Sequence, residues 1–238
     1  MKLANRSKHR GVIGVEAAIV MIAFVVVAAA LAFVVLNSGF SVTQEAKTAI
    51  ISGLNEASSS LEVAGKVTGV ACTESAQGCG TTPYLNATGI PLRIASGGDV
   101  VNLDEDYIQV RYLSNTISYD DIYIGPITTA TATSIEGGFD AGITALSELV
   151  AGQNPVDGGL TTGTYAFTYW SVSRGTQNAI LDQGEHATLA IGFDSDESVE
   201  ERPGALDKIR VEVVLSTGAT LTVERDIPTL SNKIIDLG

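Results

Sequence analysis

The chain contains few of the residues that usually carry out catalysis or bind metal ions. Its 238 residues include two histidines, two cysteines and one tryptophan. It also lacks a Gly-x-Ser-x-Gly elbow, a Walker phosphate loop and a His-Glu-x-x-His pair. General acid–base catalysis would therefore fall to carboxylates alone, and a zinc site would be short of ligands. We expect no enzyme activity, no cofactor and no bound metal.

Basic residues are also scarce, since 14 lysines and arginines stand against 27 acidic residues, for a formal charge of −13. Binding to the phosphate backbone of a nucleic acid needs the opposite sign of charge, so nucleic-acid binding is excluded. Strong acidity keeps the outer face of a polymer soluble, and a saline habitat selects the same bias. Both explanations remain open.

One long apolar run stands out against this background. Residues 17–36 are all apolar, and twenty residues of helix span about 30 Å, the thickness of the hydrocarbon core of a bilayer. The four basic residues before the run have no acidic neighbour and predict a cytoplasmic leader, with the rest of the chain outside: Lys2, Arg6, Lys8 and Arg10.

Two ordinary explanations of this segment fit less well. A secretory signal has an apolar region of about 7–15 residues followed by a small-residue cleavage site, and this run is longer. A plain membrane anchor does not account for Glu16 at the start of the helix. If the leader were cut after Gly11, the new amino group of Val12 would lie four residues from Glu16. Such a pair would set the axial register of packed helices, because an unmatched buried charge costs about 3–5 kcal/mol.

The sequence Gly11-Val12-Ile13-Gly14-Val15-Glu16, followed by an apolar helix, resembles the class III signal peptide of type IV pilin-like proteins. Together with the later segment Gly39-Phe40-Ser41-Val42-Thr43-Gln44, it resembles an archaellin, the archaeal flagellin, over about residues 8–47. The resemblance implies that a prepilin-type peptidase cleaves between Gly11 and Val12.

The same resemblance implies a precursor in the cytoplasmic membrane and an extracellular homopolymeric filament on the archaeal cell surface. The filament would serve swimming motility, and its partners would be a basal motor and a membrane platform. An adhesive type IV pilus subunit would share every N-terminal feature and remains the main alternative. A monomeric surface-binding module and an uncleaved anchored ectodomain are the others.

Apolar residues recur every three or four positions beyond Phe40, which predicts that one helix covers residues 12–64, with an interruption near Asn37-Ser38-Gly39 left open. We therefore predict three parts: a cleaved basic leader at residues 1–11, a helix at residues 12–64 and an outer domain at residues 65–238.

The outer domain shows the two-residue period of strands. Five segments alternate in polarity or are rich in β-branched and aromatic residues, and residues 216–219 form a hairpin turn between the last two: residues 107–113, 164–170, 187–191, 208–215 and 220–224. A brief helix is expected around residues 141–151. The fold class is α+β, a long N-terminal apolar α-helix followed by an all-β immunoglobulin-like sandwich of about seven or more strands.

Two modifications are expected in the outer domain. Cys72 and Cys79 enclose a short loop that an extracellular location would allow to close as a disulfide, with free thiols as the alternative. Asn86-Ala87-Thr88 is the one glycosylation tripeptide after the leader, and the resemblance to archaellins, which are commonly N-glycosylated, implies a glycan on Asn86. The acidic clusters at residues 104–106 and 194–201 match no calcium loop and are interpreted as solvated loops.

Overall fold

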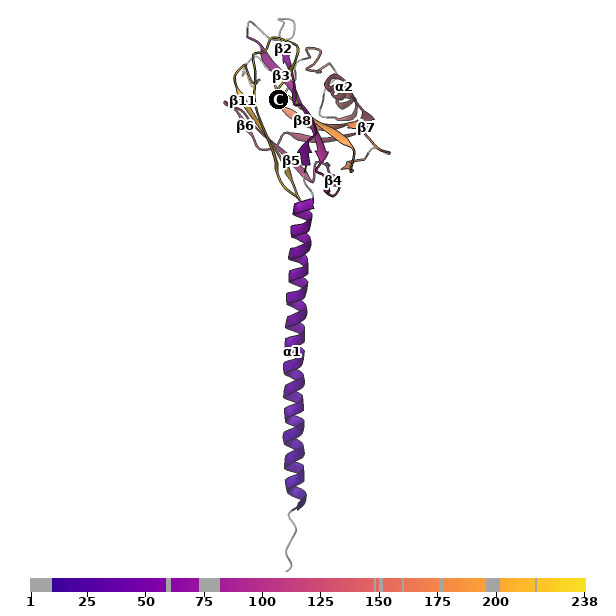
Figure 1. Ribbon diagram of the computed structural model, residues 1–238, viewed down its shortest axis with the longest axis vertical. Helices are drawn as coiled ribbons and strands as arrows, with labels where there is room; N and C mark the ends of the chain where they lie inside the picture. The colour runs from indigo at the N-terminus through magenta and orange to yellow at the C-terminus, as the bar shows by residue number, and fades with distance from the viewer. Residues whose placement is uncertain are drawn as a thin grey trace, which may run out of the picture. The chain divides into compact units, whose positions relative to one another are not determined.

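The computed structural model describes residues 10–58, 61–72, 82–147, 149, 152–159, 161–175, 178–195, 202–216 and 218–238. The chain divides into two compact units, Met1–Gly53 and Leu54–Gly238. Each unit is described by itself below, and Figure 1 labels their elements.

Helix α1 covers Arg10–Ser58 without a break. Its 49 residues correspond to about 73 Å at 1.5 Å per residue. The helix passes through Asn37 and Gly39, so no interruption occurs there. The prediction of a helix as far as Ala64 is wrong, because Leu61–Val63 is strand β1 and pairs with strand β3. Serines at positions 58–60 compete for backbone hydrogen bonds and favour the end of a helix.

The β domain has one large sheet of seven strands. Its order is β13, β2, β3, β10, β8 and β7, with β1 also paired to β3. All neighbours are antiparallel except β7 and β8. The bounds are β1 Leu61–Val63, β2 Thr68–Cys72, β3 Tyr84–Ile94, β7 Tyr123–Thr131, β8 Tyr165–Val172, β10 His186–Gly192 and β13 Ile234–Asp236.

A second sheet of four antiparallel strands has the order β12, β11, β5 and β6. A short pair, β4 with β9, is the remaining pairing among the described residues. The strands predicted from sequence alternation begin within one residue of the observed starts of β5, β8, β10, β11 and β12. The bounds are β4 Val101–Asn102, β5 Ile108–Leu113, β6 Ser118–Tyr119, β9 Ile180–Leu181, β11 Lys208–Leu215 and β12 Leu221–Asp226.

The main core lies between the two larger sheets. On β11 the side chains of Ile209, Val211, Val213 and Leu215 are buried, while the residues between them are exposed or half-buried. They join one cluster with residues of the seven-stranded sheet, including the fully buried Trp170. Because the inward faces of both sheets share this cluster, the predicted long helix followed by a β-sandwich is confirmed.

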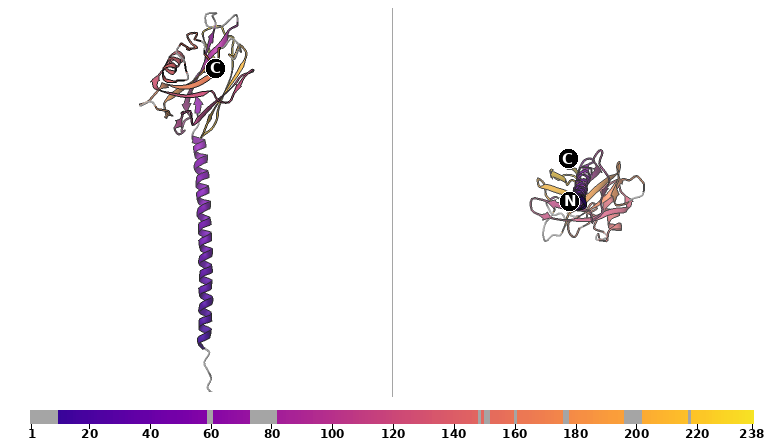
Figure 2. Two further views of the ribbon diagram at one scale, coloured as in Figure 1. Left: turned by 180° about the vertical axis from the view of Figure 1, so that it is seen from behind. Right: turned by 90° about the horizontal axis from the view of Figure 1, so that it is seen from below.

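Helix α2, Ile135–Ala145, covers the other face of the seven-stranded sheet (Figures 1 and 2). Phe139 of α2 lies edge-on to Phe167 of β8, with ring centroids 5.1 Å apart, in a second apolar cluster. The side chain of Ser134 accepts a hydrogen bond from the amide of Gly137 and caps the helix. The helix expected around residues 141–151 therefore exists, but it begins six residues earlier, and a chain segment crosses between the parallel strands β7 and β8 through it.

Candidate functional site

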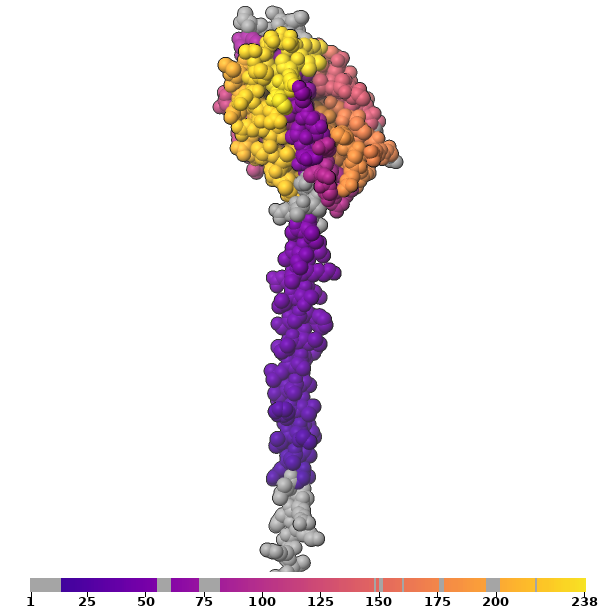
Figure 3. All heavy atoms as spheres, in the orientation of Figure 1, coloured from indigo at the N-terminus to yellow at the C-terminus, as the bar shows by residue number. Residues whose placement is uncertain are grey.

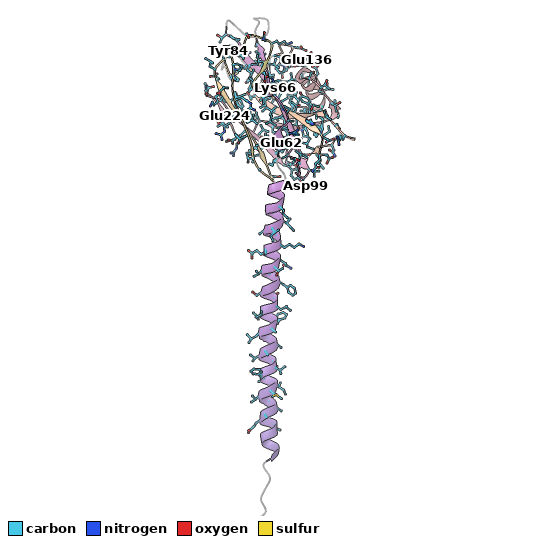
Figure 4. All side chains as sticks on the ribbon, viewed as in Figure 1. Glu62, Lys66, Tyr84, Asp99, Glu136 and Glu224 are labelled. Carbon is cyan, nitrogen blue, oxygen red and sulfur yellow. The ribbon has the colours of Figure 1, made fainter. Side chains whose placement is uncertain are left out.

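Helix α1 is apolar on all sides along residues 17–36, and every described residue from Gly14 to Leu54 is exposed. Phe24 is 76% exposed and Met21 is 71% exposed. Figures 3 and 4 show side chains projecting around the whole rod. By length and composition, Gly14–Leu54 meets the requirement for crossing a membrane. A helix without a polar face is stable in water only when lipid or other protein covers it.

Two threonine hydroxyl groups on the second half of α1 are satisfied within the helix itself. Thr43 Oγ1 donates a hydrogen bond of 2.7 Å to the carbonyl of Gly39, and Thr48 Oγ1 donates one of 2.9 Å to the carbonyl of Gln44. A hydroxyl bonded to its own helix can be covered by apolar neighbours without being left unpaired. The more polar half of α1 is therefore also suited to packing in a bundle.

A hollow runs along one side of α1, with a volume of about 590 Å³. Small residues Ala32 and Gly39 lie about two helical turns apart within it, and the larger side chains of Val35, Leu36 and Phe40 also line it. Small residues let a neighbouring helix approach closely, and the flanking side chains then fill the gaps of that neighbour. The hollow is suited to receive the side chains of another helix.

The predicted cleavage residues Gly11 and Val12 lie in the first turn of α1, where only the backbone is described. Glu16 lies four residues after Val12 and is exposed. Residues four apart share one face of a helix, so the Glu16 carboxylate lies on the side where a new amino terminus at Val12 would be. The cleavage and the pairing both remain predictions.

Cys72 ends strand β2, is fully buried and is not a free thiol. Cys79, its expected partner, lies outside the described residues, so the bridge between them remains a prediction.

The environment of Asn86 counts against a glycan there. The side chain is only 4% exposed. Its Nδ2 donates a 3.3 Å hydrogen bond to the carbonyl of Pro155, and its Oδ1 accepts one of 3.2 Å from Nη1 of Arg202. A sugar attached to Nδ2 would have to displace these groups from the domain interior. A glycan on Asn86 remains a prediction, and the place of the tripeptide in the central strand β3 argues against it.

Within the described residues, no group of three or more histidine, cysteine, aspartate or glutamate side chains is arranged to hold a metal ion. The loop of residues 104–106 closes on itself, because the carbonyl of Asp104 accepts from the amides of Tyr107 at 3.0 Å and Ile108 at 3.2 Å. Most of the second acidic cluster, residues 196–201, lies outside the described residues.

Sequence reasoning missed Glu185, a carboxylate that is only 3% exposed. It accepts hydrogen bonds from Nε1 of Trp170 at 3.3 Å, from the amide of Arg174 at 2.6 Å and from the amide of Asp182 at 3.2 Å. These bonds fasten the connection between β8 and β10 and offset the cost of burying the charge. No sequence signal separates this glutamate from the solvated ones, and its role is structural.

Comparison with known proteins identifies the family. The model of the archaeal-type flagellin family matches residues 11–225. "Probable flagellin 1" of Aeropyrum pernix is 33% identical over 224 residues, covering 93% of both chains. "Probable flagellin 1" of Archaeoglobus fulgidus is 34% identical over 123 residues, covering 47% of this chain and 57% of that one.

Solved structures show the same fold. The archaeal flagellum of Methanospirillum hungatei aligns with a TM-score of 0.57 at 21% identity, covering 94% of this chain and 98% of the other. The flagellin FlaB1 of Methanocaldococcus jannaschii aligns with a TM-score of 0.54 at 12% identity, covering 74% and 95%. The extent of the family match and the identity to the Aeropyrum relative show that the chain belongs to the archaeal-type flagellin family.

Proposed function

We propose that this chain is made as a membrane-held precursor and that, once its leader is removed, helix α1 leaves the lipid and packs against copies of itself. Membership of the flagellin family makes the chain a structural subunit of the archaeal swimming filament. The observation that supports the assembly route is α1 itself, which is apolar on every side along residues 17–36 and exposed along Gly14–Leu54.

The free energy of this exchange comes from packing more than from the hydrophobic effect. Lipid tails cover apolar side chains as well as protein does, so leaving the bilayer gains little from removal of water. Close contact between helices decides the outcome, and the small residues Ala32 and Gly39 permit it. The β domain, with its acidic composition, would face the surrounding solution.

Processing is the step that releases α1. The family match begins at Gly11, the residue after which we expect a prepilin-type peptidase to cut. The basic residues of the leader would otherwise keep the N-terminal end of the helix at the cytoplasmic face. After the cut, the amino group of Val12 pairs with Glu16 of the same or a neighbouring subunit and fixes the register of the bundle.

The finished filament is extracellular, on the cell surface. We propose a basal motor and a membrane platform as its partners at the cell envelope. The alternative, an adhesive type IV pilus subunit, has the same N-terminal elements, and the flagellin family match favours the swimming filament over it.

The experiment is deletion of the chain in its host, followed by complementation. Wild type should restore swimming and filaments whose subunit begins at Val12 by mass spectrometry. Gly11→Val should leave an uncut precursor in the membrane. Gly14→Ala should be cut normally, because a Cβ added at Gly14 would have nothing within 4 Å. Filaments and adhesion without any effect on swimming would support the pilus instead.

A further inference from the structure

Leu206 is 82% exposed, the highest value for a large apolar side chain among the described residues. Its backbone φ is +71°, and it is the one described residue other than glycine with a positive φ. Positive φ is rare for bulky residues, because Cβ then crowds the backbone. The fold therefore holds a leucine in a strained conformation and directs its side chain into solvent.

The strain arises in a four-residue turn. The amide of Asp207 donates a 3.3 Å hydrogen bond to the carbonyl of Gly204, which makes Leu206 the third residue of the turn. A positive φ at that position usually selects glycine or asparagine. Other bonds fix the turn, since the amide of Leu206 donates to the carbonyl of Ile227 at 2.9 Å and Oδ2 of Asp207 accepts from the amide of Gly204 at 2.8 Å.

The turn is also attached to the rest of the sandwich. Gly204 forms a β-bridge with Tyr84, whose place on the domain is labelled in Figure 4, and Asn115 Nδ2 donates to Oδ1 of Asp207 at 2.9 Å. A well-fastened turn that carries an unfavourable residue points to a function outside the subunit's own stability.

A depression of about 290 Å³ lies at the other end of strand β11. Its walls include Ile108, Val214 and Leu215, and Tyr107, which is half-exposed, also lines it. Two of the acidic residues that line it are Glu105 and Asp121. Ile108 and Leu215 are themselves buried, so the depression exposes apolar surface through Tyr107 and Val214 beside its acidic side chains.

Leu206 precedes β11 by two residues, and Val214 and Leu215 end it, so the strand of eight residues separates them by about 26 Å. The leucine cannot reach this depression within one subunit. In a filament in which β11 runs along the axis, copies that repeat in one orientation would bring the Leu206 end of one domain to the depression of the next, a head-to-tail contact that does not close. Lys208, two residues after the leucine, is paired within its own subunit with Glu224 at 2.9 Å and Asp226 at 3.7 Å, so the contact depends on burial of the leucine and not on a free charge.

We propose that Leu206 of one subunit inserts into the depression formed by Tyr107, Ile108, Val214 and Leu215 of a second copy, as a contact between β domains along the filament. This inference rests on the proposed function, because it names the partner as another subunit of the same filament.

The first test is Leu206→Asn, because asparagine tolerates the positive φ and removes the apolar side chain. Filament recovered per cell should fall about tenfold, the factor expected for losing the burial of one leucine. The unfolding temperature of subunits dissociated in detergent should stay the same or rise. Val172→Asn, at another exposed apolar residue, should leave filament recovery unchanged. Wild-type recovery from Leu206→Asn would overturn the proposal.

The second test is a crosslink between Leu206→Cys and Ser216→Cys, since Ser216 also lines the depression. Oxidised filaments of the double variant should give a ladder of dimers, trimers and longer chains in non-reducing gels, and each single variant should not. Intact filaments of the double variant that dissolve to monomers would overturn the contact while leaving the filament function standing. Absence of any filament from the wild-type chain would instead overturn the proposed function.

Discussion

Nη1 of Arg202 donates a hydrogen bond of 3.2 Å to Oδ1 of Asn86, which lies 116 residues earlier in the chain. Both side chains are buried, and the guanidinium carbon also lies 5.2 Å from the centre of the Tyr84 ring. A buried charged donor with a fixed partner tolerates little change at that partner. The pair therefore holds Asn86 as an interior residue of β3.

The first prediction is that Asn86 carries no sugar. Trypsin cuts after Lys66 and Arg93, so residues 67–93 are released as one peptide that contains Cys72, Cys79 and Asn86. Mass spectrometry of this peptide from purified filaments should show no added hexose, because Nδ2 of Asn86 is buried and hydrogen-bonded. Before reduction, the same mass should be lower by two hydrogens if the predicted bridge between the cysteines is present. A sugar-bearing peptide would contradict the packing of Asn86.

The second prediction concerns Thr88, the last residue of the same tripeptide. Thr88 is fully buried, and its Oγ1 has no hydrogen-bond partner in the described structure. Valine has the same shape without the hydroxyl, so Thr88→Val should raise the free energy of unfolding by about 1–2 kcal/mol.

Thr161 provides the matched control, because its buried Oγ1 donates a hydrogen bond to the carbonyl of Phe193. Thr161→Val should lower the free energy of unfolding by about 1 kcal/mol. Denaturant titration of the full chain in detergent measures both variants, and a similar loss of stability in both would show that the Thr88 hydroxyl is satisfied.

The alternating strands could be predicted from the sequence, whereas the strands at the centre of the large sheet could not. On β11 the buried Ile209 and Val211 alternate with the charged Lys208, Arg210 and Glu212. This period of two identifies a strand with one solvent-exposed face. Strand β3 is buried along most of both faces and shows no such alternation.

Glycine and proline also obscure β3 in the sequence. A Cβ on Gly89 would lie 3.1 Å from the side chain of Ile135 in α2, so the glycine makes room for a helix that comes more than forty residues later. No local pattern contains that information. For the same reason the burial of Asn86 could not be predicted, since a tripeptide motif does not report which face of which strand it will occupy.

The third prediction is a loss of stability at alkaline pH. Burial raises the pKa of Tyr165 above its usual range, and its hydroxyl has no hydrogen-bond partner in the described structure. Above about pH 10 the unfolded tyrosine loses its proton while the folded one keeps it. The unfolded state then binds fewer protons, so the free energy of unfolding falls as pH rises towards the folded pKa.

Tyr165→Phe should therefore weaken this fall and leave stability at pH 8 unchanged or higher. Denaturation midpoints at pH 8 and pH 11 for the variant and the wild type measure the difference. Burial also raises the pKa values of Tyr123 and Tyr169, so the variant should still lose some stability at alkaline pH. If the free energy of unfolding fell equally in the wild type and in Tyr165→Phe, Tyr165 would ionise as readily in the folded as in the unfolded chain.

The fourth prediction compares two adjacent glycines of α2. A Cβ on Gly138 would lie 2.3 Å from the ring of Tyr169, so Gly138→Ala must push the helix from the sheet and should cost about 1–3 kcal/mol. A Cβ on Gly137 would meet only the side chains of Ser134 at 3.3 Å and Ala132 at 3.6 Å. Alanine favours the helix by up to about 1 kcal/mol, so Gly137→Ala should be close to neutral. The same denaturant titration distinguishes the two variants. An equal loss in the free energy of unfolding would contradict the packing of Gly138 against Tyr169.

The fifth prediction separates processing from assembly at Glu16. Glu16→Gln keeps the size of the side chain and removes its charge, so the peptidase should still release a subunit beginning at Val12. The new amino group of Val12 would then lack its partner inside the bundle, and an unmatched buried charge costs about 3–5 kcal/mol. Filaments should therefore be sparse or absent although the mature subunit accumulates in the membrane. Glu45→Gln, which removes an exposed charge from the same helix, should assemble like the wild type. Abundant filaments from Glu16→Gln would show that the register of the helices is set by their apolar packing alone, with hollows such as that around Ala32 and Gly39 providing the alignment.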